Sequence, residues 1–206
     1  MALPGAAVAG IPQTQRLKLT LKGEIMQLTI AKNELLKQVE NLYLEAFPAS
    51  ERKPFAMLEE MQRQGLAEIL SMVDDQGTFL GLAIVMRRGD LALLDYLAVA
   101  PEGRGRGVGS ETIRQLARRF AGSRLLIEIE LPDPQAENNP QRLRRKQFYL
   151  RAGFCPMEIH ISLAGVAMEL LSLGGAVSWE EYYRLQVELI GLERVQKMLD
   201  LHRLDA

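Results

Sequence analysis

Apolar residues recur along this chain with the periods of both strands and helices. Three short and almost wholly apolar runs lie in its first half, and Asp75-Gln76-Gly77 and Gly89-Asp90 break them. Short apolar runs with such turn residues between them are typical of an antiparallel meander. We therefore expect three consecutive strands at residues 66–73, 78–86 and 91–99.

Helical patterns precede and follow this meander. Asn33 is placed to cap a helix that runs to about Phe47, and Pro54 suits the first turn of a second helix that stops at Gly65. After the meander, a helix, a strand and a second helix predict a parallel continuation, and two further runs predict a closing hairpin. These elements are a helix after Ser110, a strand at 125–131, a helix at 141–154 and hairpin strands at 159–163 and 166–172.

Two more helices are predicted at the C-terminal end, one with a capping box formed by Ser178 and Glu181 and one at about 192–201. Alternating leucines in 16–22 add an edge strand. The whole pattern predicts an α/β fold with a mixed, mostly antiparallel central sheet flanked by helices. We divide it into an extension (1–24), a core (25–172) and a helical embellishment of the same domain (173–206). Coverage of the core explains the last two helices more simply than a dimer contact or a substrate lid does.

The stretch that follows strand 91–99 is rich in glycine and arginine. Closely spaced glycines let backbone N–H groups point into one cavity, and the N-terminus of the next helix adds partial positive charge, so this loop suits a phosphate. A Walker loop is excluded, because no lysine lies between Lys53 and Lys146. A dinucleotide fingerprint starting at Gly105 is weakened, because Ser110 stands where its third glycine belongs, although Glu128 sits near the distance of a ribose-binding acid.

A third pattern, R-x-x-G-x-G, is met by Arg104, Gly107 and Gly109. It resembles the acetyl-CoA pyrophosphate loop of the GNAT superfamily of N-acetyltransferases. The segment Phe148-Tyr149-Leu150-Arg151-Ala152-Gly153-Phe154 is similar to the FYxxxGF signature that closes the core of the same superfamily. The resemblance extends over about residues 27–201. One position departs from it, because Arg142 stands where many members have an asparagine that contacts the pantetheine arm.

The resemblance implies that acetyl-CoA is the cosubstrate and that Tyr149 faces its sulfur. A phenol of pKa about 10 stays protonated at neutral pH, which makes Tyr149 the candidate acid for the departing thiolate. Backbone groups at the end of strand 91–99 would hold the pantetheine arm and polarise the thioester carbonyl. The implied cofactor-binding residues are Leu97, Ala98, Val99, Arg104, Gly105, Arg106, Gly107, Val108, Gly109 and Ser110.

The general base is less defined by the sequence. Period-two alternation puts Glu128 and Glu130 on one face of their strand and Asp95 on the face of Leu97 and Val99, so each of the three acids can relay a proton through water. We select Glu130 because it is nearest the expected C-terminal opening of the sheet. Four glutamates on the first two helices and their loop predict an acidic mouth for a cationic amine. They are Glu45, Glu51, Glu59 and Glu60.

The composition of the chain argues against some classes of binding partner. The formal net charge is −1 and the pI about 6.2, which argues against an obligate nucleic-acid binder. A single cysteine, Cys155, excludes an intrachain disulfide and suits a reducing compartment, and we find no export signal or membrane-spanning run. We expect a cytoplasmic protein that binds no metal. The sequence leaves open whether the chain forms a homodimer.

The resulting hypothesis is an N-acetyltransferase that moves an acetyl group directly from acetyl-CoA to a primary amine of a small molecule or peptide. The alternatives are a CoA-binding module without catalysis, a nucleotide-dependent oxidoreductase, and an RNA-binding protein that uses the basic run 142–146.

Overall fold

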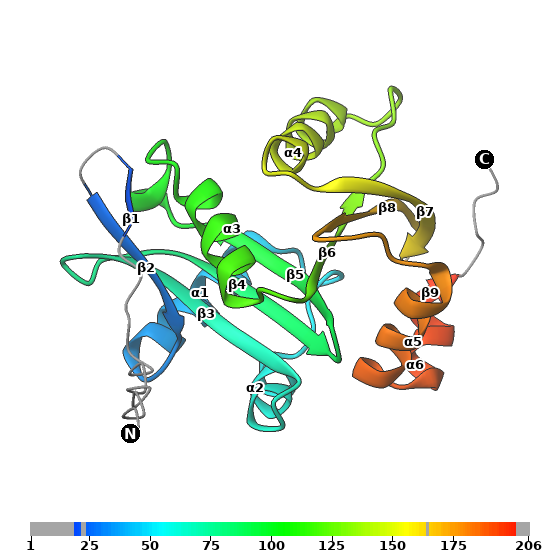
Figure 1. Cartoon of the computed structure of the whole chain (residues 1–206), viewed down its shortest axis with the longest axis horizontal. Helices are drawn as coiled ribbons and strands as arrows, with labels where there is room; N and C mark the ends of the chain where they lie inside the picture. Colours follow the sequence, from blue (N-terminus) through cyan, green and yellow to red (C-terminus); the bar gives the residue numbers. More distant parts are fainter. Residues whose placement is uncertain (1–18, 22–23, 164, 201–206) are drawn as a thin grey trace, which may run out of the picture.

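The computed structural model describes residues 19–21, 24–163 and 165–200. Its strands form one sheet in the order β1-β2-β3-β4-β5-β6-β8-β7-β9, with helices on both faces (Figure 1). The strands are β1 (Leu19–Leu21), β2 (Glu24–Ile30), β3 (Ala67–Asp74), β4 (Phe79–Arg88), β5 (Leu91–Val99), β6 (Arg124–Glu130), β7 (Cys155–Leu163), β8 (Val166–Leu173) and β9 (Leu199–Asp200). The α-helices are α1 (Glu34–Ala46), α2 (Phe55–Arg63), α3 (Val108–Arg119), α4 (Asn139–Arg151), α5 (Trp179–Ile190) and α6 (Leu192–Met198), and a 3₁₀ turn, η1, spans Pro101–Gly103.

The predicted fold class is confirmed. Strands β3, β4 and β5 pair antiparallel as a meander, and β5 pairs parallel with β6 through the crossover helix α3. The closing hairpin is also present, and its second strand β8 lies between β6 and β7. The sheet is therefore mostly antiparallel with one parallel pair.

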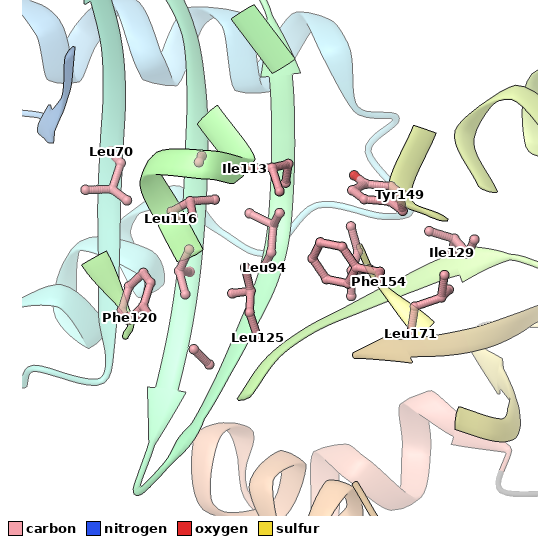
Figure 2. Packing of buried hydrophobic residues seen from close by; sticks show 14 residues of the cluster. Leu70, Leu94, Ile113, Leu116, Phe120, Leu125, Ile129, Tyr149, Phe154 and Leu171 are labelled. Carbon is pink, nitrogen blue, oxygen red and sulfur yellow. The ribbon is translucent and has the colours of Figure 1, made fainter. Parts of the chain in front are cut away.

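Alternate side chains of the meander face two different sets of helices. Ile69, Ile84 and Tyr96 pack with α1 and α2 on one face, in a cluster that includes Tyr43. Their neighbours in sequence pack with α3 and α4 on the other face (Figure 2). Helices α5 and α6 pack on the half of the first face that includes Leu93 and Leu126. The sheet thus separates an α1/α2/α5 side from an α3/α4 side.

Four predicted helix boundaries are wrong. Helix α4 spans Asn139–Arg151 rather than 141–154. Asn33 precedes α1 but has a φ of 51°, and its side chain accepts no capping hydrogen bond, because its backbone is turned out of the geometry that a capping side chain needs. Pro54 lies just before α2 rather than within its first turn, and α2 ends at Arg63. Helix α6 ends at Met198, because the chain then pairs with the free edge of β7 as β9. The edge strand expected at 16–22 is present as β1, and the rest of that segment lies outside the described residues.

A side-chain amide continues the sheet where β1 stops. The register of β1 reaches Met26, and beyond it Gln115 of α3 accepts from the backbone N–H of Leu28 at 2.8 Å and donates to the carbonyl of Met26 at 3.0 Å. The same amide donates to Glu111 at 2.8 Å. Gln115 therefore fixes α3, and the loop that precedes it, against β2.

We expect Gln115→Leu to lower the free energy of unfolding by roughly 1–3 kcal/mol, because it leaves buried backbone groups of β2 without partners. Urea denaturation measures this change. Gln147→Leu is the matched control, since Gln147 is exposed on α4 and its replacement should change stability by less than about 0.5 kcal/mol. Equal stabilities of the two variants would contradict the anchoring role of Gln115.

Candidate active site

The sheet is interrupted between its two parallel strands. Strand β5 pairs with β6 only over Leu91–Leu93 and Arg124–Leu126, and the two strands then separate (Figure 1). Beyond Leu93 the described registers leave the β6-facing edge of β5 unpaired, up to Val99. Unpaired backbone N–H and C=O groups need partners, so this edge is suited to bind an extended polar chain.

A β-bulge marks the place where the strands separate. Ile84 of β4 pairs with Tyr96 and Val85 pairs with Leu94, so Asp95 is the extra residue on β5. A bulge of this kind re-aims side chains and is common next to functional sites. Leu97, Ala98 and Val99, the predicted backbone-binding residues, follow the bulge directly and pair with β4 on their other edge.

The glycine-rich loop connects the end of β5 to α3. Gly105 and Gly107 have φ values of 74° and 78°, which residues with a side chain rarely adopt. Gly107 is the N-cap of α3 and no side chain caps the helix, so the first backbone N–H groups of α3, from Val108 to Ser110, are available to an anion. The start of α3 lies close to α4, because a Cβ added at Gly109 would lie 3.4 Å from the ring of Phe148.

The two arginines of the loop differ in their surroundings. Arg104 is exposed. Arg106 is half-buried, donates to the carbonyl of Glu102 at 3.1 Å and lies 3.4 Å from the carboxylate of Asp74 at the β3–β4 turn. Arg104 therefore offers its charge to solvent, whereas Arg106 also braces the loop against the sheet.

Tyr149 lies on the α3/α4 side of the separated strands. Its ring packs edge-on against Phe148 and Phe154, and Figure 2 shows its hydroxyl pointing away from Ile129, toward the β5 side. Burial raises the pKa of Tyr149, although Arg145 acts in the opposite direction. The phenol therefore stays protonated at neutral pH and is a weaker acid than free tyrosine.

Glu130, the predicted base, is held by the start of α4. Its carboxylate accepts from Asn138 at 3.0 Å and forms ion pairs with Arg142 at 3.1 Å and Arg145 at 2.9 Å. These three side chains fix the carboxylate of Glu130 against the start of α4. The same contacts reduce the free charge of the basic run 142–146, in which Lys146 also pairs with Glu169 at 2.8 Å.

Glu128 has a different environment on the α5 side of the same strand. Tyr182 and Gln186 of α5 each donate to its Oε1 at 2.7 Å. Burial raises the pKa of Glu128, the hydrogen bond from Tyr182 lowers it, and Asp95 and Lys53 act through their charges in opposite directions. The net direction is upward, which is the direction that makes a carboxylate a better base at neutral pH.

Lys53 and Asp95 form a largely buried ion pair on the same side. The ammonium of Lys53 lies 2.9 Å from Asp95 Oδ2, and the two side chains are only 17% and 10% exposed. Burial lowers the pKa of Lys53, but the Asp95 carboxylate outweighs burial and the pKa is raised. The backbone of Lys53 is fixed from both ends, because its carbonyl accepts from Tyr43 and its N–H donates to Tyr96.

The four glutamates of the expected acidic mouth differ in solvent exposure and in ion pairing. Glu45 and Glu51 are exposed, Glu59 is half-buried, and Glu60 pairs with Arg63 at 2.5 Å. Sequence reasoning missed Lys53, Tyr96 and Gln186 as parts of the site. The sequence contains one signal for these residues, which is that Tyr96 stands next to the candidate acid Asp95. That signal gave no indication that Lys53 belongs to the site.

No helix in the described ranges is long and apolar enough to cross a membrane. Within the same ranges, no three His, Cys, Asp or Glu residues come together as a set of metal ligands.

Comparison with known proteins gives a family match for part of the chain. Residues 68–156 match the family model described as acetyltransferase (GNAT) domain. A structure from Bacteroides thetaiotaomicron, described as a GNAT-family acetyltransferase, is 21% identical with a TM-score of 0.67, over 81% of this chain and 99% of that one. No curated protein sequence matches significantly.

Two further structures are of spermidine N-acetyltransferase from Vibrio cholerae. One, in complex with CoA and spermine, is 12% identical with a TM-score of 0.58, over 72% of this chain and 94% of that one. The other, a dodecameric form, is 14% identical with a TM-score of 0.56, over 72% and 92%. These two structures share the fold of this chain. Its residues 68–156 are a GNAT domain, from β3 to the start of β7.

Proposed function

We propose that this protein transfers an acetyl group directly from acetyl-CoA to a primary amine, without an acyl-enzyme. The observation that carries the proposal is the separation of β5 from β6, which leaves an unpaired strand edge next to the glycine-rich loop. A protonated phenol, Tyr149, lies on one side of this place and a half-buried carboxylate, Glu128, on the other. Direct transfer needs these parts and no nucleophilic side chain.

The chain has the residues that acetyl-CoA requires. The backbone N–H groups of the loop from Arg104 to Ser110 and the start of α3 would hold the pyrophosphate, and Arg104 would add charge. The unpaired edge at Leu97, Ala98 and Val99 would hold the pantetheine arm and orient the thioester carbonyl. The structure of the loop, with positive φ at Gly105 and Gly107, fits this role.

The proton transfers are assigned to two residues. We propose Glu128, rather than Glu130, as the group that removes a proton from the acceptor ammonium, because Glu130 is already bound by Arg142 and Arg145. Tyr149 would give its proton to the thiolate that leaves. Apolar surroundings also raise the pKa of a thiol. The pKa of the Tyr149 phenol and that of the leaving thiol would therefore both be raised, so that Tyr149 can still protonate the thiolate.

The acceptor is proposed to be a cationic primary amine. Because Lys53 neutralises Asp95, the α1/α2/α5 side has a surplus of acidic groups in Glu45, Glu51 and Glu59. A screen of acceptors that detects released CoA tests the function, with a polyamine, an amino-terminal peptide and a neutral alcohol. Turnover with cationic amines supports the proposal. Binding of CoA without turnover of any amine would favour a CoA-binding module, and turnover of only the alcohol would contradict the acceptor class.

We expect CoA to raise the melting temperature of the protein, by about 2.7 kcal/mol of native-state stability at 100 times its Kd. Gly107→Val should abolish most of this shift, because a branched side chain at a φ of 78° distorts the loop and blocks approach of the pyrophosphate. Thermal unfolding with and without CoA measures both effects.

The control for that measurement is Gly122→Val. Gly122 has a φ of 90° in the turn after α3, so the substitution causes comparable backbone strain away from the loop. This variant should melt earlier but keep the CoA shift. A protein stabilised by an adenine dinucleotide and not by CoA would instead be a nucleotide-dependent oxidoreductase.

A further inference from the structure

Helix α5 reaches the candidate site although it lies outside the GNAT domain at residues 68–156. Two of its residues, Tyr182 and Gln186, are one helical turn apart and therefore on the same face. Both donate to one oxygen, Oε1 of Glu128, and Gln186 Nε2 also lies 3.1 Å from the hydroxyl of Tyr182. The three side chains form one connected polar group.

This group is rigidly held. Tyr182 is fully buried and Gln186 is 7% exposed. The capping box of Ser178 and Glu181 fixes the start of α5, and Leu185 and Leu189 anchor the same helix in the apolar cluster with Leu126. Because packing decides where α5 lies, the two donors are in place before any substrate binds.

Two donors on one oxygen make the two oxygens of Glu128 unequal. Oε1 is engaged twice, whereas no described residue donates to Oε2. A proton that arrives at this carboxylate therefore finds its free lone pairs on Oε2. The donors also prevent rotation that would exchange the two oxygens.

We propose that Tyr182 and Gln186 are positioning residues for acetyl transfer: they hold Glu128 through Oε1 and leave Oε2 to receive the proton of the acceptor. This inference rests on the proposed function, because it takes Glu128 as the base. It gives the C-terminal helix α5 a part in the reaction besides coverage of the core.

The charged groups around Glu128 set the sign of the expected pH effect. Asp95 on β5 raises the pKa of Glu128, Lys53 before α2 lowers it, and Tyr182 on α5 lowers it through the hydrogen bond. Removing the phenol hydroxyl therefore raises the pKa, so that the ionised base appears only at higher pH.

The test compares Tyr182→Phe with Tyr183→Phe. Tyr183 is the adjacent residue on α5 and is half-buried against Trp179, so its variant controls for loss of a phenol. Tyr182→Phe should move the acidic limb of kcat/KM to higher pH by about one unit. Activity should fall by up to about tenfold below the new midpoint and recover above it. Gln186→Leu should shift the limb in the same direction.

A second readout does not need activity. The carboxyl carbon of Glu128, followed by NMR titration of the labelled protein, should show the same rise in pKa in Tyr182→Phe and none in Tyr183→Phe. An unshifted carboxyl titration would overturn the inference. So would a shifted titration with an unshifted activity profile, because the hydrogen bond would then exist without a part in the reaction. If wild type transfers acetyl to no amine, the proposed function fails, whatever the titration shows about Tyr182.

Discussion

Glu128→Gln is expected to lower kcat for acetyl transfer by about 10²- to 10⁴-fold, the usual contribution of a positioned general base. Glutamine has nearly the same shape and its carbonyl can still accept from Tyr182 and Gln186, so the fold and the position of α5 should persist. The proposed CoA site consists of the loop and the edge of β5 and does not include Glu128, so the expected CoA-induced rise in melting temperature should be unchanged.

Glu130→Gln discriminates between the two carboxylates of β6. This substitution removes the ion pairs with Arg142 and Arg145 and should reduce kcat by less than about tenfold, because charge pairing at the start of α4 mainly orders that helix. Steady-state kinetics at saturating acetyl-CoA compares the variants. A larger loss in Glu130→Gln than in Glu128→Gln would restore Glu130 as the base.

The loop and the strands were predictable because their signals are local. The apolar run of β5 matches the observed bounds Leu91–Val99 without change, and the capping box at Ser178 forms as expected. The R-x-x-G-x-G loop was identified from Arg104, Gly107 and Gly109 alone, since positive φ and a following helix are properties of a few adjacent residues. Local chemistry determined these parts of the site.

The acid–base arrangement could not be predicted, because it depends on pairs that are far apart in the sequence. Tyr182 and Gln186 are 54 and 58 residues from Glu128, and Lys53 is 42 residues from Asp95. Alternation along β6 placed Glu128 and Glu130 on one face, which is where sequence reasoning had to stop. Their partners, α5 for one and α4 for the other, follow only from how the helices pack on the sheet.

These contacts also change how the two sides of the sheet are interpreted. On the α3/α4 side, Arg104 is exposed to solvent, whereas Arg142 and Arg145 pair with Glu130. On the α1/α2/α5 side, the ammonium of Lys53 is largely buried and is neutralised by Asp95. An anionic cosubstrate and a cationic acceptor would therefore approach from sides of opposite charge.

Tyr149→Phe is expected to lower kcat by about 10²-fold or more while leaving the affinity for CoA nearly intact. The substitution removes only the hydroxyl, and the ring keeps its edge-on contacts with Phe148 and Phe154. Stability should change little for the same reason. Turnover at saturating acetyl-CoA gives the effect on kcat, and the CoA-dependent rise in melting temperature shows whether binding is preserved.

The dependence of kcat on pH provides a second test of Tyr149 as the proton donor. A role of its ring in packing alone would not change this dependence. Burial raises the pKa of Tyr149, so the phenol keeps its proton, and its ability to donate, above the pKa of about 10 of free tyrosine. The alkaline limb of kcat for the wild type should therefore lie above about pH 10, and Tyr149→Phe should lose the part of the profile that depends on this proton. Equal turnover in wild type and Tyr149→Phe would remove Tyr149 from the mechanism. A decline in wild-type kcat well below pH 10 would assign the proton to another group, because a buried phenol cannot ionise there.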